Sequence, residues 1–193
     1  EIQWIVLDTD GDHMLLLSKY GLDAKQYHTK YVRITWENCS LREWLNGAFL
    51  ETGFTADEQA DILLTEVDNS PEQGFSKWRD VDSGNNTQDR VFLLSYAEAN
   101  KYLGVTYEDG ENVTARVAPT AYAIAKHAWA KRELRTAEGD YAGRWWLRSP
   151  GRHPNRAAHV HSVAELNEKW KVFLEQDYQK KPHAGIREYY ESM

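Results

Sequence analysis

Strand patterns lie at both ends of this sequence, and this order constrains the fold more than any other feature. Residues 2–7 are apolar and β-branched, an Asp-Gly turn signal follows, and residues 14–17 are apolar again. This pattern predicts a β-hairpin. Residues 185–190 are typical of a closing strand. We therefore expect one α+β domain over residues 1–193 in which the two terminal strands pair.

Two helices are predicted soon after the hairpin, and we expect both to pack on the sheet. In residues 35–46, Ser40 is placed to cap the first helix and Glu43 to complete a capping box. The second helix follows Thr55, and the acidic residues directly after it suit the first turn of a helix.

Later segments predict further short elements. Residues 91–95 have the pattern of a buried strand, and residues 157–163 alternate as a strand does. Short helices are expected at 96–103 and 119–129. Residues 66–90 are polar and aperiodic, so they predict a long surface loop with room for a short strand. Residues 166–178 fit either a helix or a strand, and this assignment stays open.

Charge, hydropathy and cysteine content exclude several classes of protein. The net charge of −7 argues against a nucleic-acid binder, because phosphate recognition needs a basic surface. No apolar run approaches the roughly 18 residues that cross a bilayer, so we expect a soluble chain. One cysteine, Cys39, makes neither an internal disulfide nor a thiolate zinc cluster. The chain begins at Glu1 without a methionine, which leaves its compartment open.

The charge is unevenly distributed along the chain. Residues 1–143 contain 14 Lys+Arg and 24 Asp+Glu, whereas residues 144–193 contain 9 and 6. Four of the seven histidines also lie in this last quarter. The C-terminal quarter therefore presents a different kind of surface.

Residues 144–151, with the sequence RWWLRSPG, combine two tryptophans, two arginines and a Pro-Gly turn. The simplest interpretation is a strand that buries one tryptophan and stacks the other beneath an arginine. Five apolar positions are expected to carry the stability of the scaffold by burial: Trp4, Trp44, Leu93, Trp145 and Leu147.

Several motifs in one order resemble a known family. They are IQWIVL, LLLS, TWENCSLREWLN, VFLLSYAEANKYL, APTAYAIAKHA, WWLRSPG and a terminal GIR. This order resembles the DUF6273-like domains of bacteria and viruses, which are similar to the formylglycine-generating-enzyme-like branch of the C-type lectin fold. The resemblance implies that four residues are structural: Trp145, Trp146, Arg148 and Arg187. For the two arginines it implies burial and hydrogen bonds to loop carbonyls.

The same resemblance implies a function. Some similar proteins vary their C-terminal stretch through diversity-generating retroelements, which rewrite adenine-containing codons. Residues 151–193 would then form a variable ligand-binding segment, displayed on a virion or cell surface, that contacts a protein or glycan on another cell or particle. The expected function is therefore recognition without catalysis, metal or cofactor.

The contact residues expected on this surface are polar and aromatic, types that are common in binding hot spots. They are His153, Asn155, Arg156, His159, His161, Asn167, Trp170, Lys171, Asp177, Tyr178 and His183. A structural module that only positions a neighbouring domain is a further alternative.

The main alternative is a metal-dependent or sugar-cleaving enzyme. Strand alternation places His159 and His161 on one face, where they could bind zinc with His153 or His183 as a third ligand. An oxygen-activating enzyme of the formylglycine-generating type needs cysteines in the C-terminal half, and the chain has none there.

Calcium is considered for Asp8, Asp10 and Asp12, which alternate as at the start of an EF-hand loop. His13 and Lys19 occupy the positions of the loop's glycine and bidentate glutamate, so a solvated turn is the simpler interpretation.

Overall fold

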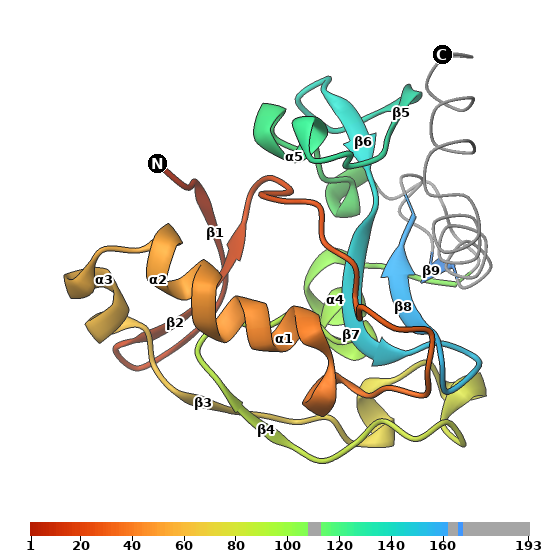
Figure 1. The fold of residues 1–193 in the computed structure, drawn as a ribbon. Coiled ribbons are helices and arrows are strands. Elements are labelled where there is room, and N and C mark those ends of the chain that lie inside the picture. The colour runs from red at the N-terminus through yellow and green to blue at the C-terminus, as the bar shows by residue number, and fades with distance from the viewer. Residues whose placement is uncertain (108–112, 162–165, 168–193) are drawn as a thin grey trace.

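Short antiparallel strands and short helices alternate along the chain (Figure 1). The computed structural model describes residues 1–107, 113–161 and 166–167; the side chains of residues 131–133 and 166–167 are outside this description. The fold is mixed α+β with few helices and small antiparallel sheets. The expected strand at 185–190, and its pairing with the first strand, lie outside the described residues.

The described strands form four small sheets, paired as β1-β2, β3-β4, β5-β6 and β7-β8-β9. All pairings are antiparallel. The bounds are β1 (Trp4–Asp10), β2 (His13–Ser18), β3 (Thr65–Val67), β4 (Thr87–Asp89), β5 (Ala130–Arg135), β6 (Tyr141–Gly143), β7 (Trp145–Pro150), β8 (Ala157–Val160) and β9 (Leu166–Asn167).

The described helices are also short. They are α1 (Ser40–Trp44), α2 (Leu50–Gly53), α3 (Ala56–Asp61), α4 (Tyr96–Leu103) and α5 (Ala121–Ala125). A π-helical turn joins α1 to α2. No helix in the described part of the chain is long and apolar enough to cross a membrane.

Side chains cap the starts of α1, α3 and α4. Thr55 and Ser95 each form a capping box, with Glu58 and Glu98 respectively, at the starts of α3 and α4. The expected cap at Ser40 is wrong, because the Cys39 Sγ accepts the Arg42 N–H at 3.4 Å. The hydroxyl of Ser40 instead accepts the backbone N–H of a loop residue distant in sequence.

The two predicted N-terminal helices differ in their packing. The first begins at Ser40 as expected, and Leu41 and Leu45 are buried in a core cluster. The second, α3, has no buried residue. The Arg90 side chain donates to the carbonyls of Gln59 and Ile62 at its C-terminal end. The expectation that both helices pack on a sheet is therefore wrong for α3.

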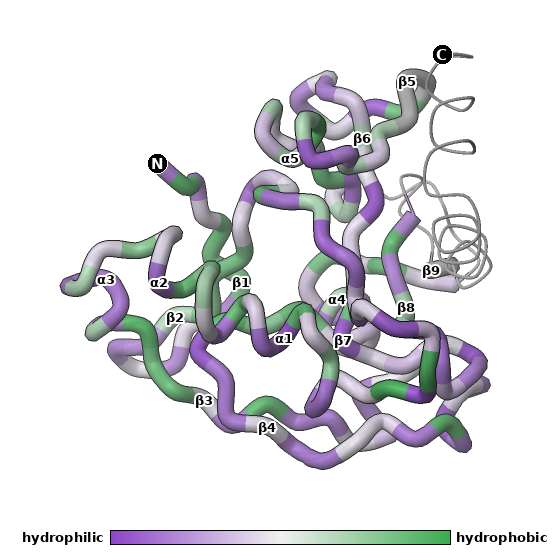
Figure 2. The backbone as a smooth tube through the Cα atoms, in the orientation of Figure 1, coloured by the Kyte–Doolittle hydropathy of each residue, from purple (hydrophilic) through white to green (hydrophobic). Residues whose placement is uncertain are grey.

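The N-terminal hairpin forms as predicted, but its outer face stays exposed. A register shift between Val6 and Asp8 interrupts the pairing, and Leu7 and Leu17 pack against a core cluster. Apolar residues run along β1 in Figure 2, yet the Trp4 side chain is 41% exposed. The prediction that Trp4 carries core stability is wrong, because the side chain is exposed and its ring stacks on Phe54.

Residues 91–95 do not form the predicted strand. They have no regular secondary structure, and they lack a strand partner among the described residues. The Leu93 and Leu94 carbonyls instead accept bonds from the side chain and backbone N–H of Arg148. A strand does form in the predicted loop, where β4 pairs with β3.

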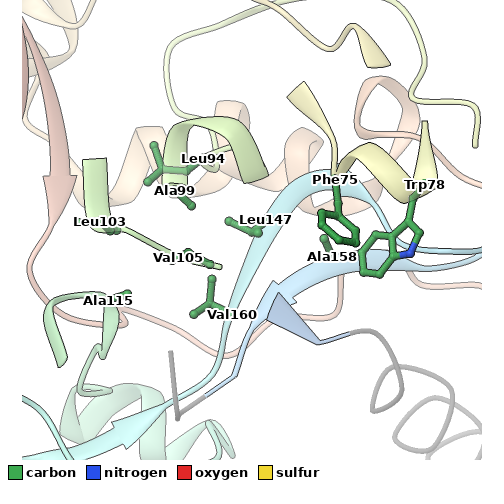
Figure 3. Close-up of a cluster of buried hydrophobic side chains, with 10 residues drawn as sticks. All are labelled: Phe75, Trp78, Leu94, Ala99, Leu103, Val105, Ala115, Leu147, Ala158 and Val160. Atoms are coloured by element: carbon green, nitrogen blue, oxygen red, sulfur yellow. The ribbon is translucent and has the colours of Figure 1, made fainter. Parts of the chain in front are cut away.

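Sheet β7-β8 lies between two clusters of buried side chains. On one face, Leu147, Ala158 and Val160 join the cluster that also contains Phe75, Trp78 and Leu94 (Figure 3). On the other face, Ala157 belongs to a cluster with Tyr27, Trp36 and Leu41, and Trp146 packs against it. All four residues of β8 are therefore buried.

The residues expected to stabilise the scaffold differ in how deeply they are buried. Leu147 is fully buried, as predicted. Trp44, Leu93 and Trp145 are half-buried and pack against the two clusters.

Candidate functional site

Arg148 anchors strand β7 from beneath. It is 3% exposed and donates to the Leu93 carbonyl at 2.8 Å and the Asp68 carbonyl at 3.0 Å. Its guanidinium also forms a bidentate ion pair with the Glu98 carboxylate. Nη2 donates to Oε1 at 2.7 Å, and Nη1 donates to Oε2. Glu98 Oε2 in turn accepts the Ser95 N–H. The burial and carbonyl contacts predicted for Arg148 are thus confirmed.

Ser149 extends the same network. Its hydroxyl donates to the Gln73 carbonyl at 2.8 Å and accepts the Tyr96 N–H at 2.9 Å. The Ser95 hydroxyl donates to the Gln73 side chain at 2.8 Å. The last residues of β7 are therefore tied to the start of α4 and to the loop before it.

Backbone hydrogen bonds hold the turn between β7 and β8. Gly151 N donates to the Arg156 carbonyl at 2.8 Å, and Arg156 N donates to the His153 carbonyl at 2.9 Å. A Cβ on Gly151 would lie 3.0 Å from the Cβ of Arg156, so the close approach favours glycine. Ile34 N also donates to the Pro154 carbonyl at 3.1 Å. This rigid turn carries three expected contact residues, of which one is exposed and two are half-buried: His153, Asn155 and Arg156.

His159 does not lie on an exposed surface. It is 4% exposed, sits opposite Trp146 in the strand pairing, and meets that indole edge-on at 5.8 Å between ring centroids. The prediction that His159 is an exposed contact residue is wrong. Alternation suggested one exposed face, but both faces of β8 are covered, so alternation decides only which cluster each side chain meets.

His161 lies in a different environment, at the end of β8. It is half-buried, and its ring centroid is 5.7 Å from that of Trp129. The Arg144 guanidinium lies 3.7 Å from the centroid of the same indole. The contact between Arg144 and Trp129 has cation–π geometry.

The three described histidines of the expected site do not gather at one point. Among the described residues, which include His153, His159 and His161, no three His, Cys, Asp or Glu side chains are placed to hold a metal ion. The first histidine is in the turn, the second is under Trp146, and the third is against Trp129.

The remaining expected contacts lie beyond the described side chains. The backbone of Asn167 pairs with His159 in sheet β8-β9. Six residues lie outside the described residues: Trp170, Lys171, Asp177, Tyr178, His183 and Arg187.

The two tryptophans of β7 are both half-buried, and each donates to a distant carbonyl. Trp145 Nε1 donates to Ala115 O at 3.1 Å, and Trp146 Nε1 donates to Lys25 O at 3.0 Å. Arg144, from the same motif, stacks on Trp129, and the stacking of an arginine on one of the two β7 tryptophans stays a prediction.

Sequence reasoning missed the loop at residues 25–34, which supports the turn. The Tyr27 hydroxyl donates to the Arg148 carbonyl at 3.1 Å, and the Tyr27 ring meets Trp146 at 5.9 Å. Burial raises the pKa of Tyr27 well above its usual value. No local pattern marks this loop, because its partners are more than a hundred residues away in the sequence.

Two other groups with possible chemistry have structural roles. Burial raises the pKa of the Cys39 thiol, which keeps it protonated while it caps α1. Asp8 accepts from Tyr102 at 2.7 Å and from Lys101 at 3.0 Å, and these bonds lower the pKa of Asp8 to about 2.

Comparison with known proteins identifies the family. A family model described as a domain of unknown function (DUF6273) matches residues 11–182. The chain belongs to the DUF6273 family. No curated protein and no solved structure matches this DUF6273 domain.

The DUF6273 match contains the whole of the described site. It begins at the turn of the N-terminal hairpin and includes β7, the turn and β8. The expected structural residue Arg187 lies beyond its last matched residue.

Proposed function

We propose that this DUF6273 domain recognises a ligand without chemically changing it. On this proposal the fold is C-type lectin-like, residues 151–193 are the ligand-binding segment, and the ligand is a protein or glycan on another cell or particle. The proposal also includes diversification of that segment by a retroelement. One observation carries it, namely a backbone-fixed turn with His153 exposed, held above a buried polar network around Arg148.

The physical support is that the buried frame under β7 and the turn between β7 and β8 have separate roles. The frame under β7 uses buried hydrogen bonds whose loss is costly. Exposed positions tolerate change, since surface substitutions usually alter the free energy of unfolding by less than about 0.5 kcal/mol. A turn whose backbone is already ordered also loses less entropy when a ligand binds. Such an arrangement suits a recognition surface whose side chains differ between related proteins.

The alternative enzyme has weaker support. A zinc site made of His153, His159 and His161 needs three converging imidazoles, whereas one is buried beneath an indole and another is in an exposed turn.

The binding test uses the full chain against an array of glycans and host-surface proteins. The test variant is H153A/N155A/R156A, and the matched control is E51A/K77A/K126A, three exposed residues on other segments. We expect a ligand whose Kd rises about tenfold or more in the turn variant and stays unchanged in the control. Absence of any ligand for the wild-type chain, or equal binding by the turn variant, would contradict the proposal.

Diversification is tested at the level of genes. Sibling genes from one genome should differ mainly after Gly151, at codons that contain adenine in the adjacent template repeat. Differences spread evenly over residues 1–150 would contradict the retroelement part of the proposal and leave the binding role standing.

A further inference from the structure

A cavity of about 370 Å³ lies where the loop after β2, helix α5 and strand β6 meet. Figure 1 shows α5 beside β6. Aliphatic residues, two tyrosines, a threonine and an aspartate line the cavity, so groups of different chemistry converge on one volume. They include Pro119, Ile124, Tyr20, Tyr141, Thr120 and Asp140. The volume is near the lower end of the range of about 300–1,000 Å³ that is usual for small-molecule sites.

Backbone hydrogen bonds fix one wall of this cavity. Gly21 N donates to the Ala118 carbonyl at 2.9 Å, and Thr120 N donates to the Gly21 carbonyl at 2.9 Å. These bonds make a parallel bridge between Gly21 and Pro119. The Thr120 side chain then accepts the Ala123 N–H and caps the start of α5. Because this wall is ordered without a ligand, binding costs less conformational entropy.

Asp140 supplies an unpaired carboxylate to the lining. Its backbone is held by Thr136, since Thr136 N donates to the Asp140 carbonyl at 2.9 Å and Asp140 N donates to the Thr136 hydroxyl at 3.3 Å. The side chain is exposed, and its carboxylate forms no ion pair or hydrogen bond with any described residue. Both carboxylate oxygens can therefore accept hydrogen bonds from a ligand.

Positive charges already lie beside both tyrosine rings of the lining. Lys19 Nζ is 5.5 Å from the centroid of the Tyr20 ring, and the Arg135 guanidinium is 3.9 Å from that of Tyr141. Glu138 pairs with Lys19 at 3.5 Å, whereas no described side chain forms an ion pair with Arg135. A cationic ligand would meet like charge at these rings, and an anionic ligand would meet the unpaired carboxylate. The charges around the cavity therefore favour a neutral ligand.

We propose that this cavity binds a neutral sugar unit. Hydroxyl groups of the sugar donate to the Asp140 carboxylate, and its C–H face packs on the Tyr141 ring, which is 41% exposed. An apolar peptide side chain fits less well, because it would remove water from Asp140 without supplying a donor. The cavity lies outside residues 151–193, so this inference goes beyond the proposed recognition segment and does not depend on it.

The test titrates the full chain with neutral disaccharides and follows the ring signals of isotope-labelled tyrosines by NMR. Maltose, cellobiose, lactose and chitobiose are the sugar probes, and choline and N-acetylphenylalaninamide are the cationic and apolar comparison probes. We expect at least one disaccharide to shift the Tyr20 and Tyr141 signals at a lower concentration than either comparison probe. Its Kd should not change with salt, because the ligand is uncharged.

Two single variants remove the groups that the sugar contacts. D140A removes the acceptor and Y141A removes the ring, while D61A and Y31A are matched controls at exposed residues that do not line the cavity. We expect the Kd to rise about fivefold or more in each cavity variant and less than about twofold in each control. All four side chains are exposed, so each variant should keep the wild-type circular dichroism spectrum.

Three results would overturn the inference: no disaccharide shifts the two ring signals, D140A and Y141A both bind as tightly as the wild type, or a comparison probe binds more tightly than every disaccharide. The turn variant H153A/N155A/R156A should keep its disaccharide binding. Loss of that binding in the turn variant alone would overturn this inference and support the proposed function. Disaccharide binding at the cavity, with no ligand for the turn, would support this inference and contradict the proposed function.

Discussion

At the scale of single residues, hydrogen-bond satisfaction explains the behaviour of the polar groups in the core. Arg148 donates to two carbonyls and to Glu98 through its two terminal nitrogens, so its charge is neutralised, while its buried Nε has no hydrogen-bond partner among the described residues. Asp89 is fully buried, and it accepts from Trp36, Thr87 and Arg42. Each charge is stable in the interior because several partners replace its lost hydration.

Replacing Arg148 with methionine should destabilise the fold strongly. The substitution leaves Glu98 and two carbonyls without their donor, and loss of one partner of a buried pair costs about 3 kcal/mol or more. Urea denaturation would measure the change. Arg79, an exposed residue, provides the matched control, whose replacement by methionine should cost less than about 0.5 kcal/mol. Equal stabilities of the two variants would show that the network contributes little.

At the scale of elements, side chains remote in sequence join the strands and helices. The N-terminal hairpin is tied to α4 because Asp8 accepts from Tyr102 and Lys101. Strand β8 is covered on both faces, which makes its histidine a core residue.

The link between hairpin and α4 can be followed by titration. Replacing Tyr102 with phenylalanine removes the bond that contributes most to the low pKa of Asp8, so this pKa should rise from about 2 toward its ordinary value of 3.8. Because the folded-state pKa is depressed, the stabilisation by Asp8 is present above pH 3.8 and is lost as the pH falls through about 2. Carbon-detected NMR of the carboxyl group measures the shift. An unchanged titration in the phenylalanine variant would contradict this assignment.

The two histidines on either side of the turn should respond differently to truncation. His159→Ala leaves a cavity beneath Trp146 and should lower the free energy of unfolding by about 2 kcal/mol. His153→Ala removes an exposed ring and should change it by less than about 0.5 kcal/mol. Chemical denaturation distinguishes the two, and a neutral His159→Ala would contradict the two-sided burial of β8.

At the scale of the whole molecule, β7 and β8 connect the two core clusters. Leu147 and Val160 face one cluster, and Trp146 and Ala157 meet the other. Loss of the sheet would therefore disrupt both clusters together. The expectation of one domain over residues 1–193 stays a prediction, and it leads to a test of cooperativity.

We expect urea unfolding to follow one transition that coincides when measured by tryptophan fluorescence and by far-ultraviolet circular dichroism. The physical reason is the shared sheet, because neither cluster can keep its packing without β7 and β8. Two separated transitions would show that the clusters unfold independently and would contradict a single domain.

Sequence patterns predicted much of the local structure and less of the site. The hairpin, the starts of α3 and α4, and strand β7 follow from turn signals, helix-start residues and alternation among near neighbours. The failures at residues 91–95 and His159 share one cause, because each depends on segments far away in the sequence that no local pattern indicates. The failure at Ser40 is local, because the neighbouring Cys39 caps the helix instead.

The sequence by itself determined where backbone elements begin and turn, because capping, turn formation and alternation act between residues a few positions apart. Only the tertiary structure decided that the loop at residues 25–34 meets the turn after β7, that Arg148 is neutralised by Glu98, and that β8 is buried on both faces. Packing and desolvation decide such features, since both depend on which distant side chains share one volume.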